Sequence, residues 1–327
     1  MHITKRVYDW SDSELKYCRQ LGVRHIIAIL PEELNQAPWE FLDLLELRKR
    51  AESFGLEMAA IEAPPPALHR PILLASPNRD EAIAGFSKSV ENMARAGIHT
   101  LCYDFALNPC WGRWRNGLSG GGRGDAGLIS FDSQRIENAP PSEAGVVEHE
   151  ELWERFAYFA ERVVPVAEKV GVKLACHPDD PPAGSLRGAA QILATADGMQ
   201  RLIDTVPSPS NGLLYCQGTV AEMGVDVIET TRHFLQQQKI FVVHFRNVQR
   251  QPSDGVKFDE VFIDEGDVDM AAAMQLYADH SYQGLIDPDH APVMETDTQF
   301  GRHRGYAFAI GYMTALKQVA ENSPQPS

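Results

Sequence analysis

The sequence predicts a single (β/α)8 barrel, in which eight parallel strands form the wall and eight helices cover it. Short apolar runs, typical of buried strands, alternate eight times with longer amphipathic runs, typical of helices. The strand runs show no strict polar alternation, which favours parallel strands that are covered on both faces. No G-x-G-x-x-G motif follows the first strand, and its absence counts against a dinucleotide-binding open sheet.

Turn residues bound each strand run, and a helical pattern follows most of them. Ser11, with Glu14 three positions later, is a helix start signal of the capping-box type. Several helical runs end in a glycine that suits the left-handed position after a helix, namely Gly22, Gly55, Gly97 and Gly171. The predicted strands are 3–8, 25–30, 57–63, 100–106, 173–178, 212–216, 241–247 and 284–289. The predicted helices are 11–21, 38–54, 78–96, 148–170, 195–204, 224–238, 269–279 and 302–321.

One segment, 108–147, interrupts this alternation after the fourth strand. It is rich in Gly, Pro and Arg, and connections of this length in compact domains are functional or disordered. Because it leaves the catalytic end of the barrel, we predict a lid over the site rather than a disordered insertion. The lid would carry Trp111, Arg113, Trp114 and Arg115. The whole chain, 1–327, is predicted to be one domain that includes this segment, with a flexible tail at 322–327.

Composition narrows the class of protein. The formal net charge is −15, from 30 basic and 45 acidic residues, without a basic block, so nucleic acid and anionic membranes are poor partner candidates. Five dispersed cysteines indicate a reducing environment. No run approaches the length of a membrane span, and the N-terminus has no signal-peptide pattern. We expect a soluble, cytoplasmic protein.

Four potential metal ligands stand at or near the C-terminal ends of the last four predicted strands: His177, Cys216, His244 and Asp289. In a barrel these ends meet at one mouth, where active sites are built. A buried cysteine alone is more often a packing residue, but joint placement on four successive strands favours a metal site. Two imidazoles, a thiolate and a carboxylate suit Mn, Fe, Co or Zn better than Mg or Ca.

Two further acidic residues end strands at the same mouth. Glu62 ends the third predicted strand and Asp104 the fourth. Their position predicts contacts with substrate, although each could equally be structural.

Several strings resemble the mannonate dehydratase family of xylose-isomerase-like barrels, over nearly the whole chain. The most specific are LACHPDDPP (174–182) and FDEVFIDEGDVDM (258–270). TLCYDF (100–105) with Trp111, NGLLYCQGT (211–219), VHFRNV (243–248) and PDHAPVM (288–294) follow the family's order. The resemblance implies that the four ligands already selected by strand position bind a divalent metal, usually manganese. It also implies assembly into dimers or larger homo-oligomers.

The same resemblance implies roles for residues around the ligands. His290, after the last ligand, and Tyr306 would transfer protons, although His290 could act only by hydrogen bonding and Tyr306 only by packing. Arg246, two residues after His244 on one strand, would face the same side and suit a sugar-acid carboxylate. Trp111 would contact substrate from the lid. Family members commonly carry an arginine where this chain has Asp287, so that a substrate would contact a carboxylate at this position.

The implied reaction is loss of water from a sugar acid, converting D-mannonate to 2-keto-3-deoxygluconate. One side chain would accept the C2 proton and another would protonate the departing C3 hydroxyl, while the metal would stabilise the enolate-like charge. Asp287 favours an alternative, a metal-dependent isomerase, epimerase or lyase acting on a neutral or oxidised sugar. A non-enzymatic sugar-binding barrel is the third possibility.

Overall fold

Eight parallel strands close into a barrel in the computed structural model, which describes residues 1–35, 38–115, 121–297 and 303–323. The predicted (β/α)8 fold is confirmed, and every predicted strand lies in the barrel wall. The strand order around the barrel is β1-β14-β11-β10-β7-β4-β3-β2. The strands are β1 (His2–Val7), β2 (His25–Ala28), β3 (Glu57–Glu62), β4 (Thr100–Asp104), β7 (Lys173–His177), β10 (Asn211–Cys216), β11 (Ile240–His244) and β14 (Leu285–Asp287).

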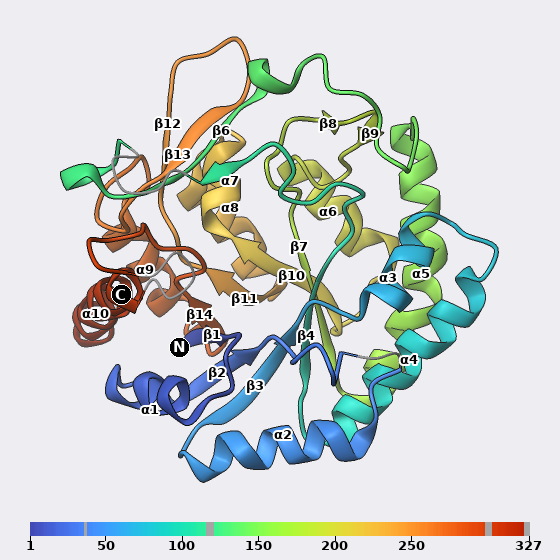
Figure 1. Cartoon of the computed structure of the whole chain (residues 1–327), viewed down its shortest axis with the longest axis horizontal. Coiled ribbons are helices and arrows are strands. Elements are labelled where there is room, and N and C mark those ends of the chain that lie inside the picture. Colours follow the sequence, from blue (N-terminus) through green and yellow to red (C-terminus); the bar gives the residue numbers. More distant parts are fainter. Residues whose placement is uncertain (36–37, 116–120, 298–302, 324–327) are drawn as a thin grey trace.

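Helices surround the barrel (Figure 1), and the eight predicted ones are present within a few residues of their expected ends. They are α1 (Asp12–Gln20), α2 (Phe41–Ser53), α4 (Arg79–Arg95), α5 (His149–Val170), α6 (Ala196–Thr205), α8 (Val227–Gln236), α9 (Met270–Asp279) and α10 (His303–Asn322). Two short helices were not predicted, α3 (Pro66–Leu73) and α7 (Gln217–Glu222). The first residue of the predicted tail, Asn322, is the last residue of α10. Residues 324–327 of the tail lie outside the described residues.

The local start and stop signals act as the sequence indicates. Ser11 caps α1, since its hydroxyl accepts a hydrogen bond from the Glu14 amide at 3.3 Å. The Glu14 carboxylate does not complete a capping box but pairs with Lys5 on β1. Gly171 ends α5 with φ 71°, a conformation that costs a residue with a side chain more than it costs glycine.

The core has two parts, as expected for a barrel with an outer layer of helices. A large cluster of buried residues packs between the strands and the helices. A smaller one fills the barrel interior, with Ile27, Ala60, Cys102, Ala175, Leu214, Phe241, Val242 and Leu285. Because the interior is filled by these side chains, polar groups can gather only at its ends.

The described parts of segment 108–147 contribute to a second sheet rather than to an irregular loop. β5 (Trp114–Arg115) and β6 (Ile129–Asp132) join β12 (Val248–Arg250) and β13 (Lys257–Glu260) in the antiparallel order β12-β13-β6-β5. We call this four-stranded sheet the accessory sheet; three of its strands are labelled together in Figure 1. The glycine-rich residues 116–120 lie outside the described residues. A remaining small hairpin is formed by β8 (Ser185–Leu186) and β9 (Ala189–Ala190).

Candidate metal centre and cleft

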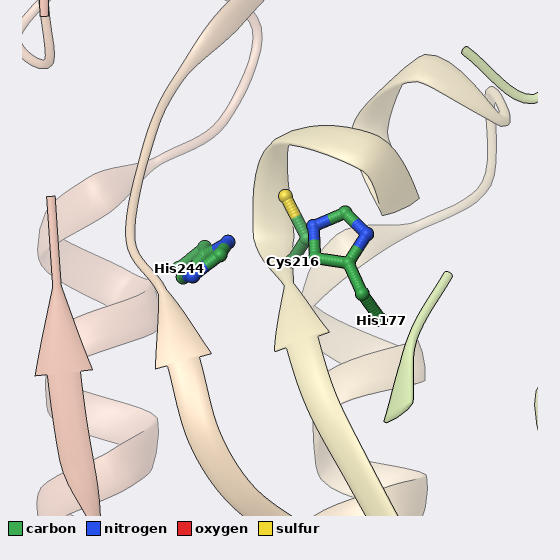
Figure 2. A group of neighbouring side chains, drawn as sticks. All are labelled: His177, Cys216 and His244. Carbon is green, nitrogen blue, oxygen red and sulfur yellow. The ribbon is translucent and has the colours of Figure 1, made fainter. Parts of the chain in front are cut away.

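Three of the four predicted ligands come together at the ends of adjacent barrel strands (Figure 2). His177 ends β7, Cys216 ends β10 and His244 ends β11. One nitrogen or sulfur atom from each lies within 4.8 Å of the others. Strand register explains the meeting, because Cys216 and His244 are directly paired across β10 and β11.

The protonation and hydrogen bonding of these groups fit a divalent metal. Burial raises the pKa of the Cys216 thiol, but Arg246 and His177 outweigh burial, so the pKa lies well below its ordinary value and the thiolate is favoured. The Nδ1 atom of His177 lies 2.6 Å from the Pro178 carbonyl oxygen, which leaves Nε2 for a ligand. His244 is only 1% exposed, and among the described residues neither of its ring nitrogens makes a hydrogen bond; the nearest carboxylates are Asp289, 3.5 Å from Nδ1, and Glu62, 3.8 Å from Nε2. A thiolate with two imidazoles suits a metal of intermediate softness.

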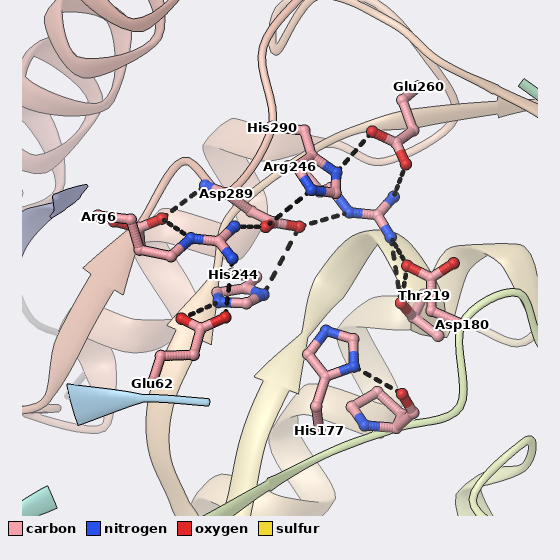
Figure 3. Close-up of polar contacts among 12 residues, drawn as sticks. Arg6, Glu62, His177, Asp180, Thr219, His244, Arg246, Glu260, Asp289 and His290 are labelled. Atoms are coloured by element: carbon pink, nitrogen blue, oxygen red, sulfur yellow. Dashed lines mark hydrogen bonds and ion pairs between the residues drawn. The ribbon is translucent and has the colours of Figure 1, made fainter. Parts of the chain in front are cut away.

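Asp289, the fourth predicted ligand, lies beside this group but outside it. Its Oδ2 is 3.5 Å from His244 Nδ1 and accepts a hydrogen bond from Arg246 Nε at 3.0 Å. Its Oδ1 pairs with Arg6 Nη2. The residue follows β14 with φ 56°, a left-handed conformation that aspartate tolerates better than most residues. The carboxylate is therefore near the three ligands while held by two arginines (Figure 3).

A cleft of about 140 Å³ opens at this end of the barrel. Glu62 and Asp104, predicted from their strand ends, both line it, and so do His177, His244, Asp289 and His290. Arg6 from β1 and Arg113 from segment 108–147 are the cationic side chains of the lining. Burial raises the pKa of Glu62, but Arg6, whose Nη1 donates to Glu62 Oε1 at 2.7 Å, outweighs burial and the pKa falls to about 2. The cleft thus combines ionised carboxylates with arginines.

Three residues predicted to contact substrate do not line this cleft: Trp111, Arg246 and Asp287. The Trp111 ring lies under the Arg187 guanidinium, 5.1 Å away, and Arg113 from the same segment faces the cleft instead. Asp287 is fully buried; it accepts hydrogen bonds from Thr4 Oγ1 at 3.2 Å and from the Asp289 amide at 2.8 Å. Its carboxylate therefore supports the turn that carries Asp289.

Arg246 is held by protein acceptors. Besides its bond to Asp289, its Nη1 donates to Glu222 at 2.7 Å. Its Nη2 donates to Asp180 at 2.8 Å and to Thr219 at 3.1 Å (Figure 3). The side chain is 2% exposed. The guanidinium neutralises buried carboxylates, and contact between Arg246 and a substrate carboxylate stays a prediction.

The two predicted proton-transfer residues are placed differently. His290 lines the cleft, its Nδ1 is 2.8 Å from Glu260 Oε2, and its Nε2 is 3.5 Å from Asp289 Oδ1. Burial lowers the pKa of His290 to about 4 despite the opposing effect of Glu260, so the imidazole is neutral at pH 7. Tyr306, from α10, is buried and donates its hydroxyl proton to the Asp289 carbonyl at 2.9 Å.

Comparison with known proteins shows the family of the chain. The sequence matches the family model for D-mannonate dehydratase (UxuA) over residues 1–146 and 144–323. The chain belongs to the D-mannonate dehydratase family. The resemblance seen in the sequence strings is thereby confirmed.

Members of the D-mannonate dehydratase family from several bacteria align with most of the chain. The mannonate dehydratase of Streptococcus equi subsp. zooepidemicus is 32% identical over 82% of this chain and 79% of its own length. Mannonate dehydratase 2 of Halalkalibacterium halodurans is 29% identical, over 89% and 90%. The crystal structure of mannonate dehydratase from Streptococcus suis serotype 2 has a TM-score of 0.88 and 28% identity, covering 100% of this chain and 97% of that one. A D-psicose 3-epimerase, at 14% identity and TM-score 0.60, shares the fold.

Two residues of this D-mannonate dehydratase family member that sequence reasoning did not assign to the site are Arg6 and Glu260. Arg6 had a detectable signal, since it is a charged residue near the end of an otherwise buried first strand. Glu260 had none, because it reaches the site from the accessory sheet, whose strand pairing depends on contacts between distant segments.

None of the helices among the described residues is long and apolar enough to cross a membrane.

Proposed function

We propose that the protein removes water from D-mannonate or a related hexonate to give a 2-keto-3-deoxy acid. The observation that carries this proposal is the group His177, Cys216 and His244 at the barrel mouth, next to a cleft that also holds His290. Family membership supports the choice of substrate, because relatives that cover most of the chain bear the name mannonate dehydratase.

The three grouped residues would hold a divalent metal, with Asp289 as the fourth ligand. Manganese is the first choice, and Fe²⁺, Co²⁺ and Zn²⁺ suit the same donor set. When bound, such an ion supplies Lewis-acid stabilisation of negative charge at a substrate carboxylate and hydroxyl. Asp289 Oδ2 lies 3.5 Å from His244 Nδ1, which supports its role as the fourth donor.

The chain's own residues would bind the acid and move its protons. Arg6 and Arg113 line the cleft and would face the substrate carboxylate, although each also pairs with protein carboxylates, whereas Arg246 does not line the cleft. Glu62 and Asp104 offer acceptors for sugar hydroxyls. His290 is neutral and open to the cleft, so its Nε2 can exchange a proton with substrate.

Tyr306 would be the second proton-transfer group of the pair. Its hydroxyl is held by the backbone of Asp289, directly next to His290 in the chain. One of the two residues would accept the C2 proton, and the other would protonate the leaving C3 hydroxyl.

Asp287 gave the isomerase or epimerase alternative its main support. That support is weaker once the residue is placed, because its carboxylate is fully buried and bonded to Thr4 and to the Asp289 amide rather than facing the cleft. An anionic substrate in the cleft is therefore not confronted by this charge. The dehydratase is the single function we put forward.

The test is to incubate manganese-loaded protein with D-mannonate and related hexonates and to detect the 2-keto-3-deoxy acid by NMR. We expect product with D-mannonate or a close stereoisomer. Absence of product from every hexonate, in protein shown to contain metal, would contradict the proposal. Interconversion of ketoses by the same sample would support the isomerase alternative. Light scattering on the same sample measures whether the protein is the expected homo-oligomer.

A further inference from the structure

Glu260, on β13 of the accessory sheet, reaches the catalytic end of the barrel and contacts His290. Its side chain is 5% exposed and does not line the cleft, whereas His290 does. Glu260 Oε2 lies 2.8 Å from His290 Nδ1 (Figure 3). Since Glu260 does not reach the cleft itself, any effect that it has on a bound substrate passes through the cleft side chains that it contacts, His290 and Arg113.

The two oxygens of Glu260 have different partners. Oε1 accepts a hydrogen bond from Arg113 Nη1 at 2.9 Å, while Oε2 faces His290. Arg113 also donates to Asp180 at 2.8 Å, so the guanidinium fixes the position of the carboxylate. A glutamate buried only to neutralise an arginine would favour a bidentate pair with both oxygens on the guanidinium. Here one oxygen is left for the histidine.

The contact selects one form of the imidazole. An ionised carboxylate can only accept hydrogen bonds, so the proton of a neutral His290 must be on Nδ1. The lone pair is then on Nε2, the nitrogen that lies 3.5 Å from Asp289 Oδ1 at the cleft. The ring orientation and the tautomer are thus set from outside the barrel.

We propose that Glu260 is a positioning residue that holds His290 with its proton on Nδ1 and its free Nε2 toward the substrate, and that Arg113 fixes Glu260 in turn. The catalytic consequence rests on the proposed dehydratase function, but the tautomer does not. The accessory sheet would then take part in catalysis without touching substrate.

The first measurement is the tautomer of His290 in zinc-loaded protein, because Zn²⁺ is diamagnetic. Long-range ¹H–¹⁵N NMR distinguishes Nδ1–H from Nε2–H, and the His290 signal is the one missing from His290→Asn protein. We expect Nδ1–H in the native chain and a loss of this preference in Glu260→Gln. Asp259→Asn is the matched control, since it removes the same charge one residue earlier on β13, where Asp259 bonds Ser130 and Gln251. An Nε2–H signal in the native chain overturns the proposal, even if Glu260→Gln fails to fold.

The second measurement is a double-mutant cycle on dehydration of D-mannonate. Glu260→Gln should lower kcat by about 10- to 100-fold, a typical effect of a supporting carboxylate, with KM and metal content nearly unchanged. In His290→Asn protein the same change should have almost no further effect, because its route is already removed. An equal loss in both backgrounds overturns the proposal. If no hexonate is dehydrated by the native chain, the proposed function fails while the NMR result still decides the role of Glu260.

Discussion

The floor and the rim of the cleft are built in different ways. The floor consists of the strand ends that carry His177, Cys216 and His244, whose positions follow from the order of strands in a closed barrel. The rim contains Glu260, from β13 of the accessory sheet, and Arg113, which directly precedes β5, and the two are hydrogen-bonded to each other. The floor concentrates metal-binding atoms, while the rim concentrates buried charge. The comparison indicates that metal affinity and the orientation of reacting groups can be changed separately.

The largest expected effect is on the floor. Cys216→Ser removes the thiolate of the three-residue group, so we expect loss of most bound metal and of activity. The change is measured by elemental analysis of the purified protein and by the D-mannonate assay. Cys176→Ser is the matched control, because Cys176 is equally buried on β7, next to His177, and is not in the ligand group. Full metal content in the Cys216→Ser protein would show that this ligand assignment is wrong.

A smaller effect, of another kind, is expected at the rim. Arg113→Met removes the cation that bridges Asp180 and Glu260, at 2.8 and 2.9 Å, in a position where the side chain is 7% exposed. Removing one partner of a buried ion pair costs about 3–5 kcal/mol. We expect the free energy of unfolding in urea to fall by that amount and activity to fall as well, while metal content stays near one ion per chain.

The matched control for the rim is Arg115→Met, at an exposed position two residues later in the same segment. It should change the free energy of unfolding only slightly. If Arg113→Met instead lost metal and kept its stability, the floor and the rim would not be separable, and the comparison between them would fail.

The floor could be predicted from sequence and much of the rim could not. The repeating strand and helix pattern placed His177, Cys216 and His244 at strand ends, and a barrel brings such ends together whatever the loops do. The rim depends on β6 pairing with β13, across more than a hundred residues of chain, and short strands in a Gly-rich segment give no periodic signal. For the same reason Arg246, which was expected on the strand of His244, lies two residues beyond the end of β11, and its bonds to Glu222 and Asp180 were not predicted. Charge pairing among buried groups is decided by packing that the sequence does not display.

The smallest expected effect concerns how the free energy of unfolding depends on pH through Glu62, which ends β3 and lines the same cleft. Glu62 is 15% exposed, and Arg6 holds its folded-state pKa at about 2, against 4.5 for the unfolded chain. Because the folded pKa is the lower one, the stabilisation is complete above about pH 4.5 and is lost as pH falls toward 2. The shift corresponds to about 3 kcal/mol at neutral pH.

Glu62→Gln should remove this contribution, so that the unfolding free energy of metal-free protein falls less steeply between pH 5 and pH 2 than in the native chain. Glu57→Gln, an exposed position at the other end of β3, serves as the control and should follow the native curve. If native and Glu62→Gln curves ran parallel through this range, Arg6 would not be stabilising an ionised Glu62. The charge of Arg6 would then be balanced by Asp289 and Asp287, with which it also pairs, rather than by Glu62.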